Sequence, residues 1–232
     1  MGEHISVLLE ESIRLLAVKA DGLYVDGTAG GGGHSLELAK RLEDGRLIAV
    51  DRDPYAIQRT QERLAGFADK LTLVQDNYCN IKGILAGEQA DGILLDLGVS
   101  SFQLDDPSRG FSYQNDAPID MRMSREDPVS AKDLVNTWSE AELREIIERY
   151  GEERYAGRIA RNLVSARERA PIETTGQLAG LIKAAIPAAA RRQGPHPAKR
   201  TFQALRIAVN QEIELLEQSV RDCIDCLKPD GV

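Results

Sequence analysis

The chain has 232 residues, 42% of them hydrophobic and 28% charged, proportions typical of a folded globular protein that exclude disordered, collagen-like and coiled-coil chains. Its 29 Lys and Arg against 37 Asp and Glu leave a net charge of -8, which argues against a protein that coats nucleic acid or anionic lipid with its whole surface. No apolar run reaches the roughly 18 residues of a membrane span, and the N-terminus lacks a basic, signal-like start, so a cytoplasmic protein is expected.

The first hundred residues alternate between apolar, strand-like runs and helix-like stretches. Strands are predicted within LYVDGTAGGGGH, RLIAVDRDP, LTLVQDN and DGILLDLGVSS, with helical segments such as SLELAKRLEDG between them. Continuous runs of Val, Ile and Leu that alternate with helices indicate a parallel sheet covered on both faces. The expected fold class is therefore α/β, with a doubly wound sheet.

Helical patterns replace strands after about residue 104. Ser139 and Glu142 form a capping box ahead of one predicted helix, and two more helices are predicted before Pro171 and in TTGQLAGLIKAAI. A longer apolar stripe predicts one helix of roughly seven turns, marked by Phe202, Leu205, Val209, Ile213, Leu216, Val220, Cys223 and Leu227. We expect a core over 1–104, an inserted helical substrate-recognition domain over 105–206 and a return helix over 207–232.

Charge is distributed unevenly along the chain. Between Arg154 and Arg206, eleven basic residues stand against only Glu168 and Glu173, so the remainder of the chain is strongly acidic. This pattern predicts that the α/β core handles a small molecule while the basic helical segment meets a polyanion. A solvated basic surface without a partner is the alternative.

Three cysteines, Cys79, Cys223 and Cys226, are too few for a disulfide framework. Cys223 and Cys226 make a C-x-x-C, but no further cysteine or histidine stands at the spacing of a zinc site. We interpret the pair as small apolar residues on one face of a helix, and expect no metal site.

A glycine-rich loop follows the first predicted strand and precedes a helix. Asp26 ends the strand, and Gly30 to Gly33 let the backbone approach a ligand closely. Asp51 ends the second strand, nineteen residues beyond Gly32, where a carboxylate can accept hydrogen bonds from both hydroxyls of a ribose. The pattern predicts an adenosine-type cofactor and leaves NAD, FAD and S-adenosylmethionine open.

Polar residues also follow the third and fourth predicted strands. Asp76, Asn77 and Tyr78 come after the third strand, where polar groups can read an adenine edge and an aromatic ring can stack on its face. Asp96 ends the fourth strand, where a carboxylate can hold an amino group that is about to be alkylated. The carboxyl ends of parallel strands share one edge of a sheet, so these side chains are expected to line one crevice with those of Asp26 and Asp51. A helix cap or a solvated loop acid is the alternative for Asp96.

Eight motifs along the chain are more informative together than any one of them: HISVLLEE, VDGTAGGGGHS, AVDRDPYAI, DGILLDLGVSSFQLD, RGFSY, IDMRM, YGEERYAGRIARNLV and HPAKRTFQALRIAVNQEI. Together they resemble one known family, the bacterial small-subunit ribosomal RNA (cytosine-N4)-methyltransferases of the MraW type. Tyr78 stands where the family often has Phe, Phe102 where Pro is usual, and Lys199 where Thr is usual. DLGVSS-x-QLD, DMRM and TFQALRIAVN are more specific than a glycine loop.

The resemblance implies a class I S-adenosylmethionine-dependent methyltransferase fold with an inserted helical domain. It implies S-adenosyl-L-methionine as cofactor and, as substrate, a cytosine near the decoding region of 16S ribosomal RNA in the small subunit. By motif position, the family's cofactor contacts fall on Gly32, Gly33, His34, Asp51, Tyr78, Asp96 and Gln103.

The chemistry of such a transfer needs hydrogen-bond acceptors, because the lone pair of the cytosine amine is delocalised into the ring. Asp96 and Ser100 are the expected catalytic residues, since DLGVSS occupies the place where amino-methyltransferases supply these acceptors. The expected substrate-binding residues are Arg109, Asp120, Arg122, Arg191, Arg192 and Arg200. A salt-bridged structural loop is the alternative for the first three.

Two other functions stay open at this point. One is a methyltransferase for another amine, in DNA or protein, and the other is a non-catalytic RNA-binding factor with the same fold. The family continues after a segment like LKPDGV with a strand and the motif FHSLEDR, so the C-terminal strands of the sheet are expected to be missing here. An uncovered sheet edge invites self-association, which makes a homo-oligomer with little transferase activity an expectation.

Overall fold

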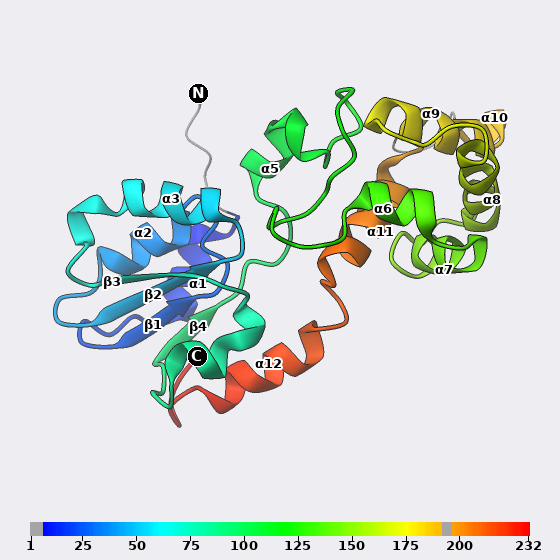
Figure 1. The fold of residues 1–232 in the computed structure, drawn as a ribbon. Coiled ribbons are helices and arrows are strands. Elements are labelled where there is room, and N and C mark those ends of the chain that lie inside the picture. The colour runs from blue at the N-terminus through cyan, green and yellow to red at the C-terminus, as the bar shows by residue number, and fades with distance from the viewer. Residues whose placement is uncertain (1–6, 192–195) are drawn as a thin grey trace. The chain divides into compact units, whose positions relative to one another are not determined.

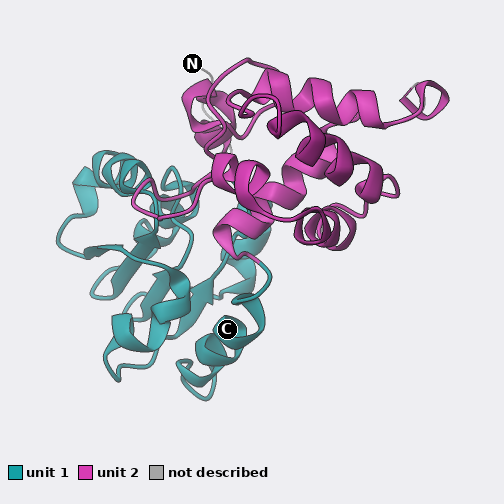
Figure 2. Cartoon of the chain, turned by 45° about the vertical axis from the view of Figure 1, so that its right-hand side comes forward, with its two compact units in different colours: residues 1–100, 213–232 teal, residues 101–212 magenta. Residues whose placement is uncertain are grey.

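The structure is a computed structural model that describes residues 7–191 and 196–232. The chain divides into two compact units, one of Met1–Ser100 with Ile213–Val232 and one of Ser101–Glu212 (Figure 2). None of the described helices combines the length and the apolar character that a membrane span requires.

The first unit contains four parallel strands in the order β3-β2-β1-β4 (Figure 1). Its elements in chain order are α1 (Leu9–Leu15), β1 (Leu23–Asp26), α2 (Gly33–Ala39), β2 (Arg46–Asp51), α3 (Pro54–Arg63), η1 (Ala65–Phe67), β3 (Leu71–Gln75), η2 (Tyr78–Asn80), α4 (Ile81–Leu85), β4 (Gly92–Leu94) and α12 (Leu216–Asp225). The predicted α/β class, with a parallel sheet, is confirmed.

Helices cover both faces of this sheet. Alternate side chains along each strand point to opposite faces, so neighbouring residues of a strand belong to different cores. Tyr24 and Leu47 pack into a core with residues of α1 and α2, while Val25 and Ile48 pack into a second core with residues of α4 and α12. Figure 1 shows α2 and α3 on one side of the strands and α12 on the other. Cys223 and Cys226 are buried in the second core, which confirms their interpretation as apolar helix residues.

β4 pairs with β1 on one side. Along its other side run the last residues of the chain, because the Ile93 N–H donates to the Val232 carbonyl oxygen at 2.8 Å and the Val232 N–H donates to the Asp91 carbonyl oxygen at 3.1 Å. Ala90 and Leu227 form a parallel bridge just before this point. Within the described residues, no strand pairs with this side of β4, which is an edge strand of the four-stranded sheet.

The second unit is helical. Its elements are α5 (Ser101–Asp105), η3 (Pro107–Arg109), α6 (Ala131–Thr137), α7 (Glu140–Arg149), α8 (Ala156–Arg167), α9 (Thr175–Ala185), α10 (Ala188–Arg191) and α11 (Lys199–Asn210). The predicted capping box of Ser139 and Glu142 begins α7, and similar boxes begin α6 and α9. The unit is wider than the expected 105–206, because α5 packs on η3 at one end and α11 packs on α6 and α7 at the other.

The prediction of one helix from Phe202 to Leu227 is wrong. Gln211 adopts a left-handed conformation with φ of 52°, its N–H donates to the carbonyl oxygens of Ile207 and Ala208, and α11 ends there. The guanidinium of Arg206 also pairs with the carboxylate of Glu212, at 2.9 and 3.0 Å, which holds the chain after the break. The helical stripe was therefore carried by two helices, α11 and α12, with a turn between them.

Candidate functional site

The strand order reverses between β1 and β4, since the chain runs from β1 through β2 to β3 and then crosses to the other side of β1. In open parallel sheets, ligands bind at such a switch point, outside the carboxyl ends of the strands. Asp26, Asp51 and Asp96 all stand at or just after carboxyl ends of these strands. The topology thus places the predicted cofactor segments of the first unit at one edge of the sheet.

The glycine loop leaves β1 and turns into α2 at Gly32. Gly30 and Gly32 have positive φ angles of 53° and 74°, which residues with a side chain adopt only with backbone strain. A Cβ on Gly32 would lie 3.2 Å from the Cα of Thr60, so the loop also packs closely on α3. Both features explain why this turn is made of glycine.

Asp51 joins the end of β2 to this loop. One carboxylate oxygen accepts the Gly30 N–H at 2.8 Å, and the other accepts the Asp53 N–H at 2.9 Å. Burial raises the pKa of Asp51 to about 6, although both of these hydrogen bonds favour the ionised form. A carboxylate has about four lone-pair sites, so acceptor capacity remains for the hydroxyl groups of a ligand.

Tyr78 begins η2, and Asp76 and Asn77 separate it from the end of β3. Its Cβ would lie 3.1 Å from a Cβ on Gly27, so the close approach of these two segments depends on the missing side chain of Gly27. The polar groups that precede Tyr78 make local hydrogen bonds: Asp76 accepts from the Asn77 N–H and the Asn80 side chain, and Asn77 caps η2.

Asp96 and His34 approach each other across the switch point. His34, in α2, is buried, and its Nδ1 lies 3.9 Å from a carboxylate oxygen of the half-exposed Asp96. The His34 Nε2 is buried without a hydrogen-bond partner among the described residues. Sequence reasoning from the residues alone would have taken His34 for a helix-start residue, and only the resemblance gave it a role.

Asp26, at the end of β1, is fully buried. Its carboxylate accepts the Ser35 hydroxyl at 2.6 Å and the Thr28 N–H at 3.2 Å, while burial raises the pKa of its carboxyl. Sequence reasoning missed Thr28, whose hydroxyl oxygen accepts the backbone N–H of Asp96 at 2.6 Å. The sequence feature that could have identified Thr28 is the presence of a hydroxyl side chain within a glycine-rich loop.

The two other residues predicted near the cofactor fall in different units. The Cβ of Ser100 lies 3.9 Å from the Cβ position of Gly30, so Ser100 is beside the glycine loop. Gln103 lies on α5 of the second unit, where it is buried.

The predicted substrate residues Arg109, Asp120 and Arg122 form one connected group in the second unit. The buried Arg109 donates to the carbonyl oxygens of Arg122 and Met123, at 3.0 and 2.8 Å. Arg122 pairs with the Asp120 carboxylate at 2.7 Å. Burial opposes the ionisation of Asp120, but the hydrogen bonds from Arg122 outweigh it and hold the pKa of Asp120 below its usual range. These contacts hold the loop together, and a role in substrate binding stays a prediction.

The remaining predicted basic residues lie farther along the second unit. Arg191 ends α10, and the exposed Arg200 lies in α11, where it donates to the Glu152 carbonyl oxygen at 3.1 Å. Arg192 lies outside the described residues.

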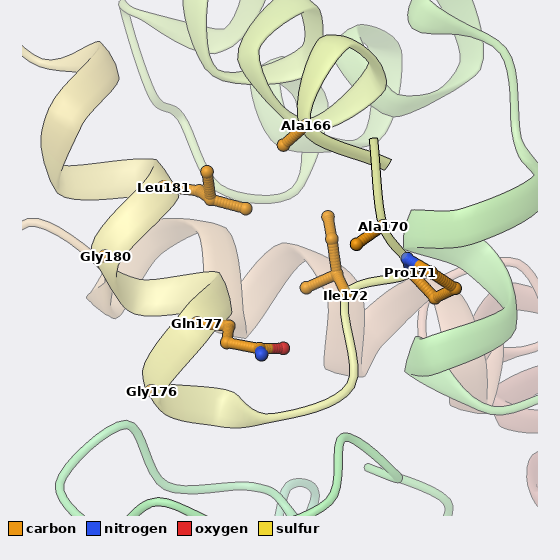
Figure 3. A pocket seen from close by; sticks show the side chains of 8 residues that line it. All are labelled: Ala166, Ala170, Pro171, Ile172, Gly176, Gln177, Gly180 and Leu181. Atoms are coloured by element: carbon orange, nitrogen blue, oxygen red, sulfur yellow. The ribbon is translucent and has the colours of Figure 1, made fainter. Parts of the chain in front are cut away.

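A groove of about 350 Å³ lies between α8 and α9 of the second unit (Figure 3). It is lined by Ala166, Ala170, Pro171, Ile172, Gly176, Gln177, Gly180 and Leu181. The lining is mostly apolar and includes none of the predicted site residues. Over the described ranges, no group of His, Cys, Asp and Glu side chains could hold a metal ion.

Comparison with known proteins gives the family. The model of the MraW methylase family matches residues 1–232. A ribosomal RNA small subunit methyltransferase H from Brevibacillus brevis is 53% identical over 232 residues, which are 98% of this chain and 74% of that protein. The protein of the same description from Acetivibrio thermocellus is 55% identical over 235 residues, which cover 99% of this chain and 75% of that protein.

Among solved structures, an rRNA methylase from Streptococcus thermophilus is similar with a TM-score of 0.36 and 21% identity, over 50% of this chain and 71% of that chain. The family assignment depends on the sequence relatives and not on this likeness. The resemblance found in the motifs is confirmed: this chain belongs to the MraW methylase family.

Proposed function

We propose that this chain transfers a methyl group from S-adenosylmethionine to the exocyclic N4 amine of a cytosine in small-subunit ribosomal RNA. Two relatives that are more than half identical over nearly the whole chain are named ribosomal RNA small subunit methyltransferase H. The observation that carries the proposal is the Asp51 carboxylate at the end of β2, hydrogen-bonded to Gly30 of the glycine loop in a chain of this family.

The residues of the first unit fit such a cofactor. Asp51 retains acceptor capacity for the two ribose hydroxyls, and Tyr78 offers an aromatic ring for the adenine. The buried His34 Nε2, which has no partner among the described residues, is a polar atom that a ligand can satisfy. Gly32, Gly33, Asp96 and, in the second unit, Gln103 complete the proposed contacts.

When bound, S-adenosylmethionine supplies an electrophilic methyl group on a sulfonium. In our proposal, Asp96 and Ser100 accept hydrogen bonds from the cytosine amine, which makes its nitrogen more sp3-like and directs its lone pair towards the methyl carbon. The nitrogen becomes strongly acidic once it is alkylated, so its proton leaves without a strong dedicated base. Because the Asp96 side chain is half exposed, it can reach an incoming amine.

We further propose that the helical unit binds RNA. Its segment from Arg154 to Arg206 carries the excess of basic residues, and Arg191, Arg192 and Arg200 are the proposed phosphate contacts. Arg109, Asp120 and Arg122 are proposed to hold the base. Arg122 is suited to this, since its pairing with Asp120 orders its guanidinium.

The test is incubation of the full chain with labelled S-adenosylmethionine and small ribosomal subunits, naked ribosomal RNA, DNA or protein. Nucleoside mass spectrometry should find N4-methylcytidine in the ribosomal RNA, and the D51A variant, assayed at a cofactor concentration near the Kd of the unchanged chain, is the matched control that should form less of it. Label in DNA or protein alone would contradict the proposed substrate. Tight RNA binding without any label would indicate a non-catalytic RNA-binding factor.

A further inference from the structure

The backbone hydrogen bonds between β1 and β4 end at the switch point, and a bond to a side chain follows them. The last backbone bond runs from the Gly27 N–H to the Leu94 carbonyl oxygen, at 2.9 Å. One residue later, the Thr28 N–H turns back to the Asp26 carboxylate, and the Asp96 N–H donates to the Thr28 hydroxyl oxygen instead of a backbone carbonyl. A side chain therefore continues the pairing where the two backbones separate.

This bond ties together two loops that both belong to the proposed site. Thr28 lies in the glycine loop between Asp26 and Gly30, and Asp96 begins the segment DLGVSS. The segment turns sharply at Gly98, whose φ is 132°, before Ser100 comes beside the glycine loop. The Asp96 backbone is thus held at 2.6 Å from Thr28, immediately before the chain changes direction.

We propose that Thr28 is a positioning residue that sets the Asp96 carboxylate, and with it the acceptor loop, against the amine of the substrate. The inference rests on the proposed function, because it assigns Thr28 a part in that methyl transfer. Thr28 acts through Asp96 and not by contact with the reacting atoms. Displacement of a reacting group by about 1 Å can cost a factor of about 100 in rate, so one hydrogen bond at the base of this loop is enough to matter.

Threonine offers a clean set of substitutions for this test. Thr28→Val keeps the branched shape and removes the hydroxyl acceptor, whereas Thr28→Ser keeps the acceptor. Thr72→Val is the matched control, because Thr72 is exposed on β3 and belongs to neither loop. Each variant is compared with the unchanged full chain.

Two measurements separate the contact from its catalytic effect. In T28V, the amide resonance of Asp96 should shift and its hydrogen exchange should accelerate, because the amide loses its acceptor. The kcat for methyl transfer should fall about tenfold in T28V, with a smaller change in the Kd for S-adenosylmethionine, and should recover to within about threefold in T28S. T72V should match the unchanged chain in both measurements.

If the resonance and the hydrogen exchange of the Asp96 amide are unchanged in T28V, the proposed hydrogen bond to Thr28 is wrong. An unchanged kcat in T28V, or an equal loss in T28S and T28V, would overturn the positioning role. Failure of the proposed function would look different, since the unchanged chain would then transfer no methyl group to ribosomal RNA. If T28V does not fold, T28S alone can still test the inference. An Asp96 amide resonance that shifts in T28S while the kcat of T28S stays normal would contradict the positioning role, because the contact would have changed without an effect on catalysis.

Discussion

The carboxylate of Asp51 accepts the backbone N–H of Gly30 at 2.8 Å, so the end of β2 is fixed to the glycine loop that follows β1. The same carboxylate accepts the Asp53 N–H, and both its oxygens are therefore oriented by backbone that belongs to the site. A ligand-binding carboxylate that is already oriented loses less conformational entropy on binding. Its role can be tested by removing the side chain.

Asp51→Ala should weaken binding of S-adenosylmethionine by about 1.5 to 3 kcal/mol, the range for hydrogen bonds to a charged group. Titration calorimetry measures the change, and circular dichroism checks that the variant is folded. Asp44→Ala, which removes an exposed acid from the same unit, should bind as the unchanged chain does. Equal affinity of the folded D51A variant would contradict the assignment of Asp51 to the ribose.

Binding of S-adenosylmethionine should weaken as the pH falls through about 6, because burial raises the pKa of Asp51 to about 6 in the free chain. The ribose hydroxyls prefer the ionised carboxylate, so binding lowers this pKa and releases a proton when the free group is protonated. Calorimetry in buffers of different ionisation enthalpy should show proton release near pH 6 and almost none near pH 8. Release that is unaltered in Asp51→Asn would assign the proton to another group.

Gly27→Ala should lower the free energy of unfolding by about 1 to 3 kcal/mol, the usual range for overpacking. The new Cβ would lie 2.5 Å from Leu95 Cδ2 and 3.1 Å from Tyr78 Cβ, so the Leu95 side chain must turn away and Tyr78 must shift by a few tenths of an ångström. Gly31→Ala is the matched control, because a Cβ at Gly31 meets nothing within 4 Å. Denaturant unfolding of the two variants measures the difference, and equal stability would show that the loops yield without cost.

Replacement of Arg191, Arg192 and Arg200 by Gln should flatten the salt dependence of RNA binding. The slope of log K against log salt should become shallower by about 0.7 to 0.9 for each phosphate that the variant no longer neutralises, while cofactor affinity stays the same. Arg221→Gln is the control, since Arg221 is an exposed arginine of α12 in the other unit. An unchanged slope in the triple variant would mean that these arginines are a solvated surface without a phosphate partner.

Short-range patterns predicted much of this molecule correctly. β1, β2 and β4 were visible as apolar runs because most of their side chains are buried, and β3 was visible through its Leu and Val residues, although Thr72 and Gln75 are exposed. The capping box of α7 involves residues only three positions apart. The buried places of Cys223 and Cys226 followed from helical spacing alone. Each of these features depends on contacts between residues a few positions apart, or on whether a segment as a whole is buried. Both properties can be inferred from a short stretch of sequence.

The break after α11 was missed for a physical reason. It is made at Gln211, a non-glycine residue in a left-handed conformation, and Ile213 beyond it is 45% exposed although it continues the apolar stripe. The break is accompanied by the ion pair of Arg206 and Glu212, which local propensity does not encode.

The sequence by itself determined the fold class, the family and the residues at the strand ends. Only the tertiary structure decided which of these residues meet. His34 approaches Asp96, and Thr28 accepts the amide of Asp96 from a position 68 residues earlier. These contacts depend on β4 pairing with β1 rather than with β3, its predecessor in the chain, and strand order is a property of the packed sheet that no local pattern of residues contains.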